Sequence, residues 1–529
     1  MKLLKVIYYI VLFNFLIGGL LSCKKKEVVG PDPYAGGKVP FGVKFAEAQP
    51  LPSSGPAGSS VIFKVQGLKS YEGKFDFQIS NESTKVLDLS DSTITVEIPD
   101  NISSGIASIK LGGQIFFGPR FTVTGNVSID AGFAANLGVG TDLPINAAYE
   151  YNQGYLLVGS FLKINTQNVN HIGFINYQGT PSTNYASYTG ANGSLLSVAR
   201  LASGKFIIGG SFTGFTGRSG IGNITRLNSD GSLDVMYVNV INQTPDVPNN
   251  GLDTVPAFNA AVPNQNIIKT FVTSDNKVIA VGAISYYSTI SYAQSTRLGR
   301  FYIYKPIHTI MRTDENGVLD STYNYGPQNT GADALVNDAY LQPDDKVVLV
   351  GNFTKYNGTK VGSIVRLDGN GNVDATFLAG AGANGKINTV QYNPLMHRVM
   401  ITGNFTAYDG VACPGIAMLK DNGDLDKSFL FGAATGGEVN FARMLNNGKV
   451  LVSGTFTMYN NVSRPGFLLL NGDGSALQTF NHVGTFEGQI QQVIETTSTA
   501  GNPAVILLGL IHKFDDQTVN NIVKVEIKN

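Results

Sequence analysis

A short phrase recurs seven times along the chain, and this repeat restricts the fold more than any other feature. The four clearest copies are VVLVGNFTKYNG (347–358), VMITGNFTAYDG (399–410), VLVSGTFTMYNN (450–461) and FIIGGSFTGFTG (206–217). Weaker copies occupy 156–167, 278–288 and 505–516. A repeat of this kind means that one supersecondary unit is stacked many times, and its period indicates the architecture.

One full unit, residues 387–429, divides into four short β-forming runs. The runs are 387–392, 399–405, 415–419 and 425–429. Asn422-Gly423 lies between the last two runs and supplies the positive φ that a tight hairpin turn needs. Four strands in roughly 50 residues indicate the blades of a β-propeller.

The repeat region resembles the delta-sixty repeat, a propeller family. The resemblance is carried by Gly351, Phe353, Tyr356, Asp374 and Phe377 and by their equivalents in the next unit. It covers the chain from Asn126 to the C-terminus.

The two ends of the repeat region predict how the ring closes. The last unit stops after 522–527, without a fourth strand, whereas 125–133 reads as a fourth strand alone. A ring closes well when one blade is built from both ends, because every sheet edge is then paired. We therefore predict that 126–134 completes the blade that begins near Gln489.

Residues 40–124 contain no copy of the repeat. Short alternating β-like runs are separated by turn residues, which suggests an antiparallel sandwich. Gly55-Pro56-Ala57-Gly58 and the run 118–123 resemble an immunoglobulin-like TIG/IPT domain, which implies a spacer or partner-binding module. The predicted fold class is thus all-β: a small sandwich at 40–124, then a seven-bladed propeller at 125–529 closed by an N-terminal strand.

The N-terminal residues have the pattern of a targeting signal. Two lysines precede an apolar stretch at 6–21, which suits a signal peptide better than a membrane span. It ends in Leu20-Leu21-Ser22-Cys23, which resembles the lipobox of bacterial lipoproteins and implies a lipid on Cys23. We expect a signal peptide at 1–22 and an anchor and tether at 23–39. An ordinary signal peptide or a short anchor helix is the alternative.

The tether and repeat together resemble lipoproteins of the Bacteroidetes group. This resemblance implies an outer-membrane lipoprotein in the cell envelope. Surface export in that group is associated with acidic residues after the cysteine, and this chain has lysines there. The cell surface and the periplasmic face therefore both stay open.

Charge and cysteine content exclude some functions. Lys plus Arg and Asp plus Glu number 38 each, and no sustained basic run occurs, so a nucleic-acid partner is not expected. Once the signal peptide is removed, Cys23 and Cys413 leave no obvious disulfide pair.

Two insertions break the regularity of the repeat, at about 238–266 and 285–308. Because strand direction alternates within a blade, both insertions are expected on one face of the ring. Loops carry function more often than scaffold does. Tyrosine and arginine suit the mixed surface of a sugar or a protein partner. The predicted ligand-binding residues are Tyr286, Tyr287, Tyr292, Arg297, Arg300, Tyr302 and Tyr304. The alternative is a longer hairpin that packs on the next blade.

The remaining candidates indicate structure rather than chemistry. Repeated Tyr356, Tyr408 and Tyr459 are expected to pack between blades. Repeated aspartates at 234, 320, 374 and 426 are expected to fix turns rather than bind metal. No zinc-protease or serine-hydrolase motif is present, so no metal, cofactor or catalytic residue is predicted.

The sequence therefore favours a lipid-anchored envelope protein that binds a polysaccharide or glycoconjugate. A protein–protein scaffold is the first alternative. A glycoside hydrolase or lyase is the second, and it would need paired carboxylates in the ring centre.

Overall fold

The computed structural model describes residues 41–182, 190–247 and 250–528. Residues from Lys44 onward form one compact unit. The predicted signal peptide, the tether and Cys23 lie outside the described residues. No helix within the described ranges is long and apolar enough to cross a membrane.

The N-terminal domain is a sandwich of two sheets. One has the order β1-β3-β7-β6, and the other β2-β9-β8-β4-β5. The strands are β1 (Lys44–Phe45), β2 (Ser54–Gly55), β3 (Ser60–Gln66), β4 (Phe75–Ile79), β5 (Glu82–Ser83), β6 (Lys85–Leu89), β7 (Thr93–Glu97), β8 (Gly105–Leu111) and β9 (Gln114–Val123). Strict alternation of buried and exposed residues along β3 places Phe63 against Phe77 in the core. The predicted small sandwich before the propeller is confirmed as a fold class.

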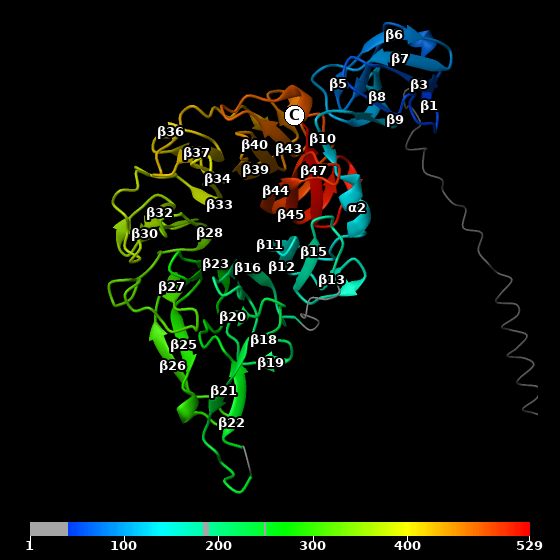
Figure 1. Cartoon of the computed structure of the whole chain (residues 1–529). Helices are drawn as coiled ribbons and strands as arrows, with labels where there is room; N and C mark the ends of the chain where they lie inside the picture. The colour runs from blue at the N-terminus through cyan, green and yellow to red at the C-terminus, as the bar shows by residue number, and fades with distance from the viewer. Residues whose placement is uncertain (1–40, 183–189, 248–249, 529) are drawn as a thin grey trace, which may run out of the picture. The chain divides into compact units, whose positions relative to one another are not determined.

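The rest of the chain forms seven sheets around a centre (Figure 1). In blades 1 to 6 the strands, from the inside outward, are β11 (Ile145–Tyr151), β12 (Gly154–Gly159) and β15 (Ile172–Asn176); β16 (Leu195–Arg200), β17 (Phe206–Gly210) and β20 (Ile224–Leu227); β23 (Ile267–Val272), β24 (Val278–Gly282) and β27 (Ile310–Thr313); β28 (Val336–Leu341), β29 (Val347–Gly351) and β32 (Ile364–Leu367); β33 (Lys386–Asn393), β34 (Arg398–Asn404) and β37 (Ile416–Lys420); and β39 (Val439–Met444), β40 (Val450–Gly454) and β43 (Phe467–Leu470). Figure 1 shows the first strand of each blade nearest the centre. The propeller is confirmed.

The fourth strand of these six blades is shorter than predicted. In blade 5 the run 425–429 is not a strand, and only Leu425 pairs, with Leu419. The reason is the repeated aspartate that follows. The Asp426 carboxylate accepts hydrogen bonds from the backbone N–H and the hydroxyl of Ser428, which turns the chain away from the sheet.

Blade 7 closes the ring as predicted. Its order is β44 (Glu487–Thr497), β45 (Pro503–Phe514), β47 (Ile522–Ile527) and β10 (Val127–Ile129). Val127 pairs with Ile527 in antiparallel register. The contributed strand is shorter than the predicted 126–134, because Asp130 caps helix α2 (Ala131–Leu137) by accepting a hydrogen bond from Phe133 N.

A small hairpin joins the second strand to the third in each of the first six blades. These hairpins are β13–β14 (Lys163–Ile164, Gln167–Asn168), β18–β19 (Gly214–Phe215, Arg218–Ser219), β25–β26 (Tyr286–Ile290, Tyr302–Pro306), β30–β31 (Lys355–Tyr356, Thr359–Lys360), β35–β36 (Ala407–Tyr408, Val411–Ala412) and β41–β42 (Met458–Tyr459, Val462–Ser463), to which β38 (Ala434–Thr435) adds in blade 6. We call the side of the ring that carries them the insertion face, and the opposite side the turn face. Each first strand runs from the insertion face to the turn face, because neighbouring strands are antiparallel.

The repeated side chains are structural, as predicted. Tyr408 and Tyr459 are buried and donate hydrogen bonds to the carbonyls of Gly423 and Gly474 in their own blades. The repeated aspartates fix turns and also form ion pairs that the sequence did not reveal. These pairs are Arg226–Asp234, Arg312–Asp320, Arg366–Asp374 and Arg398–Asp426.

Polar contacts join the sandwich to the last blades. His482 Nδ1 lies 2.6 Å from the Ile102 carbonyl oxygen, and Ser104 N donates to the His482 carbonyl. Arg120 forms ion pairs with Asp515 and Asp516. These contacts involve buried and half-buried groups, so the sandwich is anchored to the ring and is more than a loosely linked module.

Candidate functional site: the central channel and the insertion hairpins

A β-bulge interrupts the first strand of every blade at the same place. At each bulge one residue has no partner in the second strand. The seven bulged residues are Asn146, Leu196, Ile268, Asn337, Asn388, Asn440 and Gln491. Five of the seven side chains are amides, and the bulges lie near the insertion-face end of the first strands.

The bulges explain the glycine in every copy of the repeat. A Cβ added to Gly351 would lie 2.1 Å from the backbone oxygen of Leu335, two residues before the bulge. The other six copies show the same approach to a backbone carbonyl, at 2.0 to 2.3 Å: Gly159, Gly210, Gly282, Gly403, Gly454 and Gly509. Only glycine tolerates a backbone this close. The repeat therefore encodes the bulge, and the bulge turns one residue per blade into the channel.

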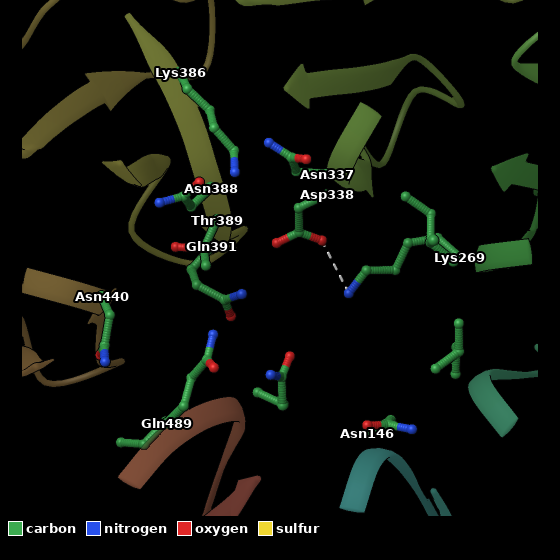
Figure 2. A pocket seen from close by; sticks show the side chains of 14 residues that line it. Asn146, Lys269, Asn337, Asp338, Lys386, Asn388, Thr389, Gln391, Asn440 and Gln489 are labelled. Atoms are coloured by element: carbon green, nitrogen blue, oxygen red, sulfur yellow. Dashed lines mark ion pairs between the residues drawn. The ribbon is translucent and has the colours of Figure 1, made fainter. Parts of the chain in front are cut away.

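All seven bulged residues line one cavity of about 480 Å³ (Figure 2). We call it the insertion-face cavity, because the bulges lie near that end of the first strands. Its other charged or amide lining residues are Lys269, Asp338, Lys386, Gln391 and Gln489. No aromatic side chain lines it among the described residues.

Two of the amides hold neighbouring blades together. Asn146 Nδ2 donates to the Leu195 carbonyl at 2.8 Å, and Asn337 Nδ2 donates to the Ile387 carbonyl at 2.7 Å. In contrast, Asn440 Oδ1 is buried and has no hydrogen-bond partner. A buried amide oxygen without a partner is costly, which makes Asn440 available to a ligand donor.

The charges in this cavity are unevenly compensated. Asp338 is buried and accepts bonds from the backbone N–H groups of Ala339 and Val390, and Lys269 Nζ lies 3.0 Å from its Oδ1 (Figure 2). Lys386 is exposed and forms no ion pair with any described residue. The cavity therefore offers amide donors and acceptors with one uncompensated cation.

The two insertions meet on the insertion face, as predicted. The first forms the hairpin β21–β22 (Val235–Asn239, Leu252–Pro256) and the second forms β25–β26 (Figure 1). Arg300 forms an ion pair with Asp253 of the first hairpin, and Arg297 Nη1 donates to Asn250 Oδ1 at 3.3 Å. We call the two joined hairpins the arm.

The arm places six of the predicted ligand residues in two environments, and Tyr287 in a third. Tyr292, Arg297 and Arg300 line a depression of about 260 Å³ between the hairpins, and burial raises the pKa of Tyr292 to about 12. Tyr286, Tyr302 and Tyr304 form a ring cluster on β25–β26, with centroids 5.7 Å apart for Tyr286 and Tyr304 and 6.1 Å apart for Tyr302 and Tyr304. The backbone of the second insertion is therefore a long hairpin, which is what the alternative to a ligand-binding loop predicted for it.

Tyr287 is a correction, because only 2% of it is exposed. It occupies the position of the repeated tyrosine in blade 3, five residues after Gly282, as Tyr356 follows Gly351. Its hydroxyl donates to the Gly317 carbonyl inside the blade, and burial raises its pKa. Tyr287 is therefore a packing residue and does not reach the surface for a ligand.

The arm also carries large exposed apolar side chains. Leu298 is 98% exposed, Tyr237 82% and Tyr304 57%. Others on the same two hairpins are Val235, Ile241, Val247, Leu252, Phe301, Tyr302 and Ile303. Such a concentration is typical of an interaction surface.

The described residues that line the channel cavities do not include a pair of carboxylates, which a glycosidase would need. Asp338 is the single carboxylate among the described residues that line the channel cavities, and its oxygens are already bonded. Within the same described ranges, no group of three His, Cys, Asp or Glu side chains is placed to hold a metal ion.

Comparisons with known families match three parts of the chain. Residues 21–119 match a domain of unknown function, DUF5008. Residues 201–235 and 342–377 match a β-propeller domain of unknown function, DUF5122. Residues 369–523 match the Rax2 C-terminal β-propeller domain. No curated protein matches the chain.

Several solved structures are similar to the chain at low identity. The WD40 β-propeller domain of Doa1 is 14% identical, with 75% of this chain and 96% of that chain covered and a TM-score of 0.40. YCF48 bound to D1 peptide is 10% identical, with 74% and 95% covered and a TM-score of 0.39. A putative phosphatase from Bacteroides thetaiotaomicron is 10% identical, with 92% and 98% covered and a TM-score of 0.36.

The class of protein follows from the sheet topology and the family matches. The chain carries a β-propeller, a scaffold whose loops and channel serve binding and interaction. The fold therefore indicates a binding or protein-interaction role.

Proposed function

We propose that this chain is a lipid-anchored cell-envelope protein that binds a polysaccharide or glycoconjugate on the insertion face of its propeller. The observation that carries the proposal is the insertion-face cavity, in which five bulged amides line about 480 Å³. Amides donate and accept at one position, as sugar hydroxyls do, so they pair well with a polyhydroxylated ligand. The anchor rests on the lipobox resemblance at Cys23.

The amides differ in what they can do for a ligand. Asn146 and Asn337 are engaged in bonds between blades, so they shape the cavity. Asn440 has a free buried oxygen and Lys386 has no ion-pair partner among the described residues, so we assign ligand contact to these two. The absence of an aromatic platform among the described lining residues favours a ligand held by hydrogen bonds.

A protein partner is the second candidate, and the exposed apolar side chains of the arm favour it. Aromatic residues and arginine are enriched in protein interfaces. Leu298 and Tyr304 project at the part of the arm where Arg297 and Arg300 lie, which supplies both features on one surface.

Three variants and one control separate the two candidates. Asn440→Leu and Lys386→Gln change the insertion-face cavity and remove no bond between blades. Gln178→Leu is the control, because Gln178 is an exposed amide in a turn on the opposite face. The third variant shortens the arm: Ile290 and Tyr302 face each other, so 291–301 is replaced by Asn-Gly, which closes a two-residue hairpin.

Each variant is tested on a glycan array and by capture from envelope extract. The glycan proposal expects a wild-type signal that falls at least tenfold in Asn440→Leu or Lys386→Gln and persists in Gln178→Leu. If no glycan binds, and a partner that also binds when purified is lost with the shortened arm, the glycan proposal fails and the protein partner replaces it.

A further inference from the structure

The channel has a second mouth with a different chemistry. A cavity of about 530 Å³ opens toward the turn face, and its lining includes the ends of the first strands. We call it the turn-face cavity. It shares five lining residues with the insertion-face cavity, so the two mouths belong to one channel: Asn146, Leu196, Lys269, Gln391 and Gln491.

The turn-face cavity is cationic although the chain as a whole is neutral. Arg200 and Arg443 line it without an ion-pair partner among the described residues, Lys269 lines it while paired with Asp338, and no described carboxylate lines it. The chain has 38 cationic and 38 acidic side chains, so this local excess is a property of the site. Low-dielectric walls around charges of one sign attract ligands of the opposite sign.

Arg443 is the most unusual of these cations. Its Nε is buried without a hydrogen-bond partner, and its guanidinium forms no ion pair with a described residue. Burial lowers the pKa of Arg443, and the charge of Glu495 opposes that shift from beyond ion-pair distance. Glu495 Oε1 is also buried without a hydrogen-bond partner, so this carboxylate compensates the Arg443 charge only in part and from a distance. Buried charges are normally paired at contact distance, so the site can accept a further anion.

Arg200 is a second arginine in the lining of the turn-face cavity, and it comes from blade 2. Its guanidinium lies 4.6 Å from the centre of the Tyr151 ring, and its Nε donates to the Gly204 carbonyl at 3.4 Å. No described carboxylate pairs with it. The stacking holds the planar group in place and leaves nitrogens of the fork for an anion.

Aromatic side chains complete the wall. Tyr149, Phe271, Tyr340 and Tyr392 line the cavity, and the rings of Tyr340 and Tyr392 stack with centroids 4.8 Å apart. Tyr340 is buried, whereas Tyr149, Phe271 and Tyr392 are partly exposed and offer a flat apolar surface to a ring-shaped ligand. The insertion-face cavity has no such surface among its described lining residues.

We propose that the turn-face cavity binds a ring that carries a carboxylate, with the carboxylate on the Arg443 guanidinium and the ring against Tyr149, Phe271 or Tyr392, while the Arg200 guanidinium adds positive charge to the same cavity from blade 2. The carboxylate accepts charge-assisted hydrogen bonds from the Arg443 guanidinium, and no covalent step is involved. The site goes beyond the glycan proposal and does not depend on it, since Arg200, Arg443 and the aromatic rings line the turn-face cavity and not the insertion-face cavity.

Two matched probe pairs identify the ligand class. Glucuronate is compared with glucose, and benzoate with benzamide, by ligand-observed NMR and calorimetry on the propeller-containing chain. The acids are expected to bind and the neutral partners are not. If glucuronate binds and benzoate does not, the ligand class is a uronic acid. If benzoate binds and glucuronate does not, the ligand class is an aromatic acid. Either result supports the site.

Matched variants locate the binding. Arg443→Gln is expected to weaken the acid at least tenfold and Arg200→Gln by a smaller factor, whereas Lys163→Gln, on the exposed β13–β14 hairpin and outside both cavities, leaves it unchanged. If a thermal unfolding experiment shows that Arg443→Gln is not folded, the affinity of Arg200→Gln for the acid tests the proposal instead. The proposal is overturned if neither acid binds at about 10 mM. It is also overturned if the neutral partners bind equally well, or if both arginine variants retain wild-type affinity.

Discussion

The glycine of the repeat is predicted to be as important for stability as any core side chain. In Gly351→Ala the new methyl group would lie 2.1 Å from the Leu335 backbone oxygen, far inside van der Waals contact. A side-chain end can rotate away, but this carbonyl is fixed by the bulge between β28 and β29. Strand β28 must therefore shift, which flattens the bulge and withdraws Asn337 from the channel.

The magnitude follows from the cost of forcing an extra methyl group into a packed site. Overpacking of this kind typically costs about 1–3 kcal/mol. Because the obstacle is backbone, we expect a loss of about 3 kcal/mol, at the upper end of that range. Asn337 also donates to the Ile387 carbonyl, so the contact between blades 4 and 5 weakens with it.

The matched control lies in the same blade. A Cβ on Gly369 would meet no atom within 4 Å, and Gly369 does not have a positive φ. Gly369→Ala is therefore expected to change stability by no more than about 0.5 kcal/mol. Urea unfolding followed by tyrosine fluorescence measures both variants. If Gly351→Ala unfolds at the midpoint of Gly369→Ala, the link between glycine and bulge is wrong.

Three further predictions concern the ring and its ion pairs. Burial alone would raise the pKa of Asp374, but hydrogen bonds from Thr376 and the charge of Arg366 outweigh it and lower the pKa to about 2. This lowered pKa stabilises the fold above pH 4 and the gain is lost as pH falls toward 2, so Asp374→Asn should cost about 2 kcal/mol at pH 7 and roughly half of that at pH 3 in urea unfolding. A cost that does not change with pH would contradict this assignment. Ser128→Pro removes a backbone donor opposite Glu526 in the closing strand and should cost about 3 kcal/mol, whereas Ser128→Ala should cost little; equal thermal midpoints for the two would refute closure by β10. Tyr287→Phe leaves the Gly317 carbonyl unsatisfied and should cost about 1–2 kcal/mol without changing ligand binding, and a binding defect at unchanged stability would return Tyr287 to the ligand site.

The sequence predicted the ring because its signals are local and repeated. The Asn-Gly turn at Asn422-Gly423 and the β-forming runs around it specify one blade, and seven copies specify a ring. The missing fourth strand of the last copy was sufficient to predict the partner of Ile522–Ile527. The predicted length of the fourth strands was wrong. In blade 5 the strand is cut short because the Asp426 carboxylate accepts a hydrogen bond from Ser428 N and turns the chain, and the sequence did not show where this turn begins.

The arm was predicted in place but not in detail. Insertion lengths showed that both loops lie on one face, and the ion pair between Arg300 and Asp253 joins them. The number of tyrosines in the second loop suggested a single surface, yet Tyr287 belongs to the repeat and points into the blade. Alignment on Gly282 would have separated it from its neighbours, so this error had a signal in the sequence.

The channel chemistry had no such signal, because each blade contributes only a short stretch of its first strand and these stretches are spread through the whole repeat region. Arg200 and Arg443 come from blades 2 and 6, and only closure of the ring places them on one cavity. Their neighbours in sequence are ordinary strand residues. The same closure gives the two mouths opposite characters: amides and a paired Lys269–Asp338 toward the insertion face, unpaired arginines and aromatic rings toward the turn face. A ligand that enters from one mouth therefore meets a different set of partners from one that enters at the other. This polarity is the property of the ring that binding experiments on the two sets of variants will measure.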